Sequence, residues 1–166
     1  MEPESTTYRT VKLELKKPWY INYLRWVFDS DTDTIKINRS ENLGRYLFSF
    51  VRNSSLPVHF DKTKPHVTLI MPDHKNSTGK NKFMYYNEED MVYINDQIES
   101  CARFDLSNMI NASRRDLGMN RKTVVSIFTT LIFGEDSYEA LIKSEYRNRK
   151  KKVLRTLESG KLLGYR

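Results

Sequence analysis

The spacing of apolar residues changes partway along the chain, and this change constrains the fold more than any other feature. Up to residue 82, segments with an apolar residue at every second position alternate with short helical segments. From Asn87 onward, apolar residues recur only three or four positions apart, as on one face of a helix. The sequence therefore predicts an α+β protein with a small mixed lobe over residues 1–82 and a helical lobe over residues 83–166.

Four strands and two helices are predicted in the first lobe. The strands are 8–15, 34–37, 56–60 and 67–71, and the first is half-buried because Val11, Leu13 and Leu15 share one side. One helix covers residues 19–28, and Asn38 with Glu41 forms a capping box that begins the other. A polar stretch from Pro72 to Lys82 has no periodicity, so we expect a loop that divides the lobes.

The helical lobe is predicted to contain four helices. Asn87 caps the first, which continues to Ala102, and the second covers residues 106–117. Gly118 ends that helix and Asn120 caps the third, whose apolar side contains Val124, Ile127, Phe128, Leu131 and Ile132. Asp136 and Glu139 form a capping box for the last helix.

The segment from Arg115 to Val124 combines a Leu-Gly helix end, an apolar residue, a polar cap and a new helix with basic and hydroxylated residues. In this respect residues 110–133 resemble the helix-turn-helix motif of tri-helical DNA-binding proteins. In such a corner, an apolar cluster would hold the two helices at a fixed angle, here Leu117, Met119, Val124 and Ile127. The resemblance implies a major-groove contact by Asn120, Arg121, Lys122, Thr123 and Ser126.

Two observations weigh on this resemblance. The family usually has a small residue where Arg114 stands in this chain. In addition, any corner between two packed helices with a Leu-Gly turn shows the same pattern. A packing corner without a role in DNA recognition therefore remains the alternative.

Positive charge is concentrated at the end of the chain. The chain has 28 basic and 21 acidic residues, and residues 141–166 contain nine of the basic and two of the acidic ones. Spacing of three or four residues allows one face of a helix to follow a phosphate backbone. We expect phosphate contacts from Lys143, Arg147, Arg149, Lys150, Lys151 and Lys152. The alternatives are a solvated tail and a sorting signal.

These features predict a cytoplasmic protein that binds duplex DNA, as a regulator or as an accessory factor of replication, recombination or a mobile element. One rival is an assembly protein of a phage-like or nucleoprotein particle, whose basic tail touches nucleic acid without sequence preference. Another is an enzyme acting on nucleic acid through a site dispersed over loops. Homo-oligomerisation or a protein partner would involve the aromatic first lobe or the apolar residues Leu162, Leu163 and Tyr165.

Motifs for cofactors, metals and catalysis are missing from the sequence. It has no glycine-rich phosphate loop, no cysteine and histidine cluster with metal spacing and no Gly-x-Ser-x-Gly elbow, so we predict no cofactor, metal or catalytic residue. His66 and Thr68 match once a tetrapeptide that two-histidine phosphoesterases carry twice. A polar, acidic amino terminus and the lack of a long apolar run argue against a secretory signal and a membrane span.

Overall fold

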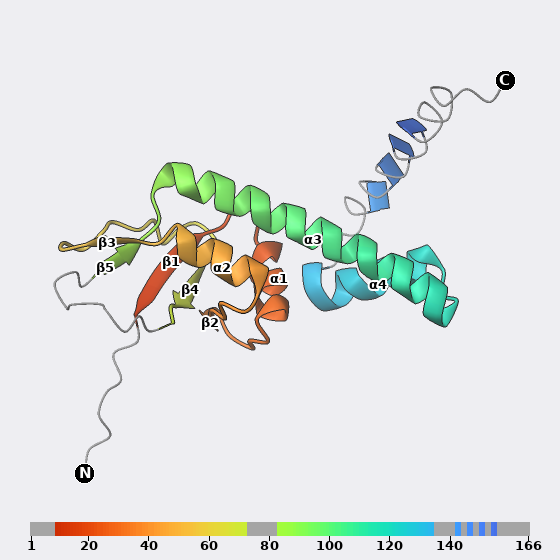
Figure 1. Cartoon of the computed structure of the whole chain (residues 1–166), viewed down its shortest axis with the longest axis horizontal. Helices are drawn as coiled ribbons and strands as arrows, with labels where there is room; N and C mark the ends of the chain where they lie inside the picture. Colours follow the sequence, from red (N-terminus) through yellow and green to blue (C-terminus); the bar gives the residue numbers. More distant parts are fainter. Residues whose placement is uncertain are drawn as a thin grey trace, which may run out of the picture. The chain divides into compact units, whose positions relative to one another are not determined.

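The structure, a computed structural model, has the predicted α+β architecture (Figure 1). It describes residues 9–72, 83–134, 142–143, 146–147, 150–151 and 154–155. The chain divides into two compact units, Met1–Arg103 and Phe104–Arg166, and this division lies inside helix α3. The polar segment 73–82 lies outside the described residues, so the lobe boundary predicted there stays a prediction.

A three-stranded sheet forms the centre of the first unit. Its middle strand β4 (His66–Ile70) pairs antiparallel with β1 (Thr10–Glu14) and parallel with β2 (Thr34–Lys36). Leu13 lies opposite Val67, and Ile35 lies opposite Leu69. Apolar residues at alternate positions point to one side of a strand, and these four side chains are fully buried. The period-two pattern thus gave the strands correctly here.

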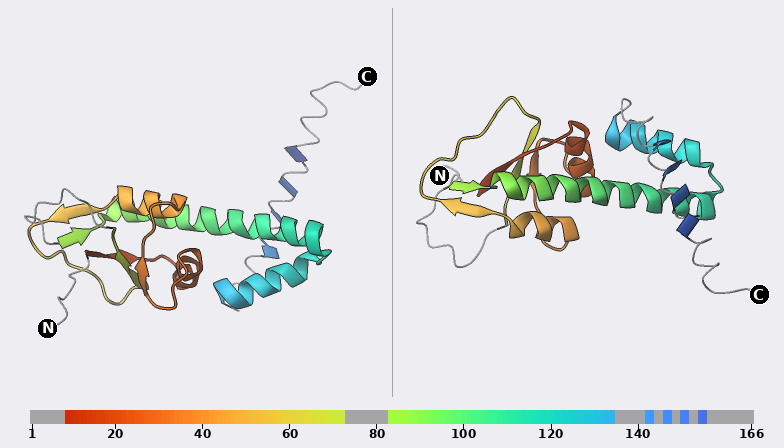
Figure 2. Two further views of the ribbon diagram at one scale, coloured as in Figure 1. Left: turned by 60° about the horizontal axis from the view of Figure 1, so that its bottom comes forward. Right: turned by 90° about the horizontal axis from the view of Figure 1, so that it is seen from above.

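Helices α1 (Trp19–Val27), α2 (Asn42–Ser49) and the first part of α3 supply the rest of this core. Figure 2 shows α2 and the first part of α3 side by side over the sheet. The Tyr86 hydroxyl, just before α3, donates a hydrogen bond of 3.0 Å to the backbone oxygen of Leu47 in α2. The buried side chains of these helices include Tyr20, Tyr23, Leu24, Leu43, Leu47, Ile94 and Ile98.

The strand predicted at residues 56–60 is wrong. This segment forms no strand, and the side chain of Leu56 is 71% exposed. A strand forms just before it in the chain, where β3 (Arg52–Ser54) pairs antiparallel with β5 (Phe83–Tyr85). Because Arg52, Asn53 and Ser54 are polar, no apolar alternation marks this strand, and its position depends on a partner about thirty residues further along the chain.

Helix α3 (Glu88–Leu117) is one helix of 30 residues, whereas two helices were predicted. No glycine or proline interrupts it, so nothing forces a break between Ala102 and Leu106. The predicted cap at its start is confirmed, because Asn87 Oδ1 accepts a hydrogen bond of 2.7 Å from the backbone N–H of Asp90.

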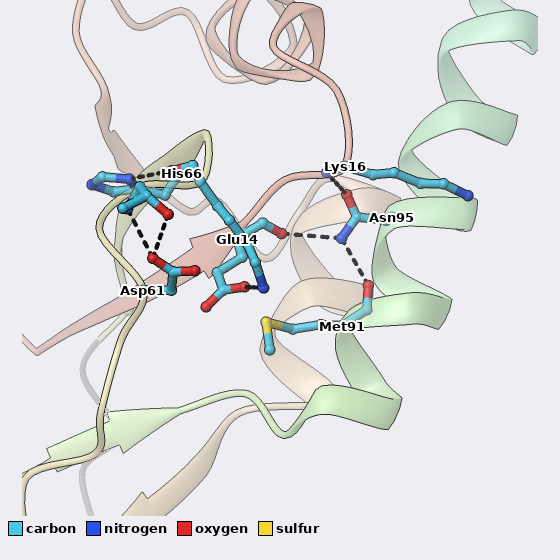
Figure 3. Close-up of polar contacts among 8 residues, drawn as sticks. Glu14, Lys16, Asp61, His66, Met91 and Asn95 are labelled. Atoms are coloured by element: carbon cyan, nitrogen blue, oxygen red, sulfur yellow. Dashed lines mark hydrogen bonds and ion pairs between the residues drawn. The ribbon is translucent and has the colours of Figure 1, made fainter.

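Asn95 attaches α3 to the segment that connects β1 and α1 (Figure 3). Its Oδ1 accepts a bond of 2.8 Å from the N–H of Lys16. Its Nδ2 donates to the backbone oxygens of Glu14 at 3.0 Å and Met91 at 2.8 Å. Because these three hydrogen bonds pair its polar atoms, the buried Asn95 amide avoids the free-energy cost of unsatisfied polar groups. The same bonds fix the position of the helix.

One turn further along α3, Glu99 makes a second attachment. Its carboxylate accepts hydrogen bonds from Lys17 Nζ at 2.9 Å and from the Tyr20 hydroxyl at 2.6 Å, and it also pairs with Arg103. Partial burial raises the pKa of Glu99, but the hydrogen bonds from Tyr20, Arg103 and Lys17 outweigh it and lower the pKa to about 2. Burial and the bond to Glu99 raise the pKa of Tyr20.

The capping box predicted from Asn38 and Glu41 is also wrong. Asn38 Oδ1 accepts a bond of 3.0 Å from the N–H of Ser40, which makes a local turn, and Glu41 is the residue that precedes α2, without a side-chain cap bond. The turn brings the backbone oxygen of Asn38 against Gly44. A Cβ atom at Gly44 would lie 2.0 Å from that oxygen, so only glycine fits.

Replacing Gly44 with alanine should therefore destabilise the first unit by about 2–3 kcal/mol, because a backbone carbonyl cannot shift without moving the turn. Urea unfolding followed by far-UV circular dichroism measures the loss. Arg45→Ala, at the exposed neighbouring position, should change the free energy of unfolding by less than about 0.5 kcal/mol. Equal effects of the two variants would contradict the close approach.

A second prediction concerns Glu99. Its pKa is lower in the folded protein than its ordinary value of 4.5, so its stabilisation is complete above pH 4.5 and is lost as the pH falls to about 2. Glu99→Gln should cost about 1–2 kcal/mol at pH 7, allowing for solvent screening, and the difference from wild type should vanish near pH 2. Urea titrations across this range provide the measurement, with Glu89→Gln as the exposed control on the same helix. A difference that is independent of pH would contradict the assigned role.

Candidate nucleic-acid interface

A three-residue turn, 118–120, connects α3 to α4 (Arg121–Phe128) in the second unit. Gly118 has a φ of 63°, the left-handed conformation that ends many helices. Asn120 Oδ1 accepts a bond of 2.9 Å from the N–H of Thr123, so the predicted cap is confirmed. In both views of Figure 2, α4 turns back from the end of α3.

The helix α4 and the π-helical segment η1 (Thr129–Phe133) that follows it have one buried and one exposed side. The buried side chains are Val124, Val125, Phe128, Thr129, Ile132 and Phe133. Ile127 is 42% exposed and Leu131 is 74% exposed, so the prediction that these two pack in the core is wrong. The buried side instead includes Val125 and Phe133, which lie on the other flank of Val124 and Phe128.

The predicted apolar cluster at the corner is likewise only partly present. Val124 is buried, but Leu117 is 70% exposed, and Met119 is half-buried. Leu117 and Ile127 therefore do not clamp α3 to α4 as the resemblance implied.

The first turns of α4 bring together the five residues predicted to contact bases. Asn120, Lys122, Thr123 and Ser126 are exposed, and Arg121 is half-buried. A hollow of about 420 Å³ lies beside them at the turn, lined by Arg114, Gly118, Met119, Asn120 and Arg121. Arg114, which departs from the pattern of the helix-turn-helix family, lies beside these residues in the lining of the hollow.

Four of the six predicted phosphate-contacting residues fall within the described part of the basic segment. Lys143, Arg147, Lys150 and Lys151 are exposed and helical in conformation, and Arg155 is a further exposed cation there. Arg149 and Lys152 lie outside the described residues, as do Asp136 and Glu139 of the predicted capping box. The predictions for Arg149, Lys152, Asp136 and Glu139 therefore stay predictions.

Charge is divided unequally between the two units. Residues 1–103 contain 15 basic and 14 acidic residues, whereas residues 104–166 contain 13 and 7. In the first unit, acidic partners hold cations in pairs such as Arg25–Asp33, Arg52–Asp90 and Lys64–Glu14. In the second unit, Asp116 pairs with Arg115. Its seven carboxylates cannot neutralise all thirteen cations.

A larger hollow, of about 810 Å³, lies in the first unit beside the Asn95 attachment. Its polar lining includes Glu14, His59, Asp61, Lys64 and Asn95. The hydrogen bond between Lys64 and Glu14, 2.8 Å long, raises the pKa of Lys64, and hydrogen bonds from Thr63 lower the pKa of Asp61. Both groups stay charged near neutrality, so this arrangement suits ion pairing rather than proton transfer.

His66 lies at the start of β4, outside this lining. Its Nδ1 is 3.0 Å from the backbone oxygen of Lys64, and its ring meets Phe60 edge-on with 4.8 Å between ring centres. These contacts account for the histidine as a packed strand residue. No three histidine, cysteine, aspartate or glutamate side chains within the described ranges are grouped in a way that could hold a metal ion.

Comparison with known proteins gives no match to a family model, to a curated protein or to a solved structure. No helix within the described ranges combines the length and apolar character needed to cross a bilayer.

Replacing Asn120 with alanine should loosen the start of α4, because the N–H of Thr123 loses its acceptor. A lost cap of this kind costs about 1 kcal/mol. Hydrogen exchange of the α4 amides should accelerate roughly fivefold, while Asn120→Ser, which preserves a cap oxygen, should stay close to wild type. Unchanged exchange in Asn120→Ala would contradict the cap.

Proposed function

We propose that the second unit, Phe104–Arg166, binds duplex DNA and that the protein acts as a regulator or as an accessory factor of replication, recombination or a mobile element. The single observation that supports this function is the excess of exposed positive charge on that unit over its carboxylates. This role goes together with the cytoplasmic location expected from the sequence.

Gathering this much positive charge in one unit costs free energy. Lys143, Arg147, Lys150 and Lys151 recur at three- or four-residue spacing in helical conformation, where like charges repel one another. A polyanion relieves this repulsion, and each cation that meets a phosphate releases a bound counterion from the nucleic acid. The first unit, with nearly equal numbers of acids and bases, has no comparable excess.

In this proposal, one set of residues contacts phosphates and another contacts base edges. The exposed cations of the basic segment, Lys143, Arg147, Lys150 and Lys151, contact phosphates, which provide affinity without sequence information. Lys122, Thr123 and Ser126, exposed on the first turns of α4, approach base edges, with Asn120 and Arg121 beside them. Arg114, which lines the hollow at the turn, is an additional candidate for a phosphate contact.

The experiment removes three described cations from each unit. Arg147→Ala/Lys150→Ala/Lys151→Ala should reduce the slope of log affinity against log salt by close to one unit for each lost phosphate contact. Lys16→Ala/Lys36→Ala/Lys62→Ala removes the same charge from exposed positions of the first unit and should leave the slope nearly unchanged. Fluorescence anisotropy with a labelled duplex, repeated over a series of salt concentrations, measures both.

Equal loss of slope in the two triple variants would show that general charge, rather than this surface, drives binding. Sequencing the nucleic acid recovered with the purified protein distinguishes the proposal from the assembly-protein rival. Recovery of a preferred sequence supports a regulator or accessory factor, and binding without any preference favours the assembly protein.

A further inference from the structure

The exposed side of α4 has an unusual composition for a helix end surrounded by basic residues. Thr123, Ser126, Ile127 and Thr130 lie three or four positions apart, so they share one face, and all four are exposed. Lys122 is the exposed cation of this face. The face therefore consists mainly of short hydroxylated side chains, together with Ile127 and, four positions further on in η1, Leu131, which is 74% exposed.

Ile127 is exposed although α4 already buries Val124, Val125 and Phe128 on its other side. Ile127 is 42% exposed and does not belong to that core. Charge complementarity indicates what covers it: the surrounding unit carries a large excess of cations, so an anionic partner is attracted to this surface. An acidic polymer that also offers apolar groups to a helix is duplex DNA.

We infer that the exposed face of α4 lies against base edges in the major groove and that Ile127 contacts the 5-methyl group of thymine. This inference rests on the proposed function and adds a base preference to it. The major groove displays the thymine methyl group, the one apolar feature among the base edges. Short threonine and serine side chains let the helix backbone come close to the groove floor, and their hydroxyls donate to or accept from any base.

A different occupant of the same face would be a second copy of the chain, with Ile127 and Leu131 packed against their counterparts. Such a contact would make the oligomeric state, rather than the base composition of the DNA, depend on Ile127. The two occupants therefore differ in what an Ile127 variant changes.

The test uses two short duplexes with alternating adenine–thymine and adenine–uracil pairs. They have the same charge and the same hydrogen-bonding groups and differ in the 5-methyl group. Wild-type protein should bind the thymine duplex about fourfold more tightly, the factor expected for burying one methyl group. In Ile127→Ala this ratio should fall to about one, and Ile127→Val, which retains a branched side chain, should preserve most of it.

Met109→Ala is the matched control, since Met109 is a similarly large apolar residue of the same unit, on α3 and 37% exposed. Its ratio should equal that of wild type. Equal binding of both duplexes by wild type would overturn the inference and, if the salt slope persists, would leave the proposed function standing. Absence of duplex binding at any salt concentration would overturn both. A dimer by sedimentation that dissociates in Ile127→Ala, with an unchanged ratio, would overturn the inference in favour of self-association.

Discussion

The hydrogen bonds of Asn95 and Glu99 are the contacts on which the arrangement of the first unit depends. They join α3 to the segment between β1 and α1. Asn95 forms hydrogen bonds with backbone groups of Lys16 and Glu14, and Glu99 accepts hydrogen bonds from the side chains of Lys17 and Tyr20. A long helix with a polar exterior is held in place mainly by the packing of its buried apolar side chains and by hydrogen bonds such as these. Because α3 continues without a break into the second unit, the same helix that completes the sheet's core also leads into the turn at Gly118.

Electrostatics separates the two units as clearly as their contacts do. Carboxylates of the first unit are used in its own structure, as Glu99, Glu14 and Asp90 show. The pKa of Glu99 is lowered and that of Tyr20 is raised, so both groups hold their protonation state through the neutral range and serve as structural contacts. In the second unit thirteen cations face seven carboxylates, and this difference in charge is the basis for proposing that this unit binds nucleic acid.

The α3–α4 corner illustrates how a local motif and the packing around it provide different information. Leu-Gly, the cap at Asn120 and the start of α4 were predictable because each depends on neighbouring residues in the chain. Which face of α4 is buried was not. Ile127 and Val125 are both branched apolar residues, so sequence spacing alone could not distinguish the one in the core from the one in solvent. Because Ile127 is the exposed one, it is the residue that we propose contacts thymine.

The sequence by itself determined the α+β class, the sheet strands with period-two alternation, the helix caps at Asn87 and Asn120 and the location of the excess charge. These features depend on residue type and on spacing within about one turn or one strand. Tertiary structure alone decided that Arg52–Ser54 pairs with Phe83–Tyr85, that Gly44 meets the oxygen of Asn38 and that Arg114 lines a hollow beside Arg121. The strand pairing joins residues about thirty positions apart, and the other two contacts depend on how the chain turns between residues six or seven positions apart. The spacing of residues along the chain does not contain that information.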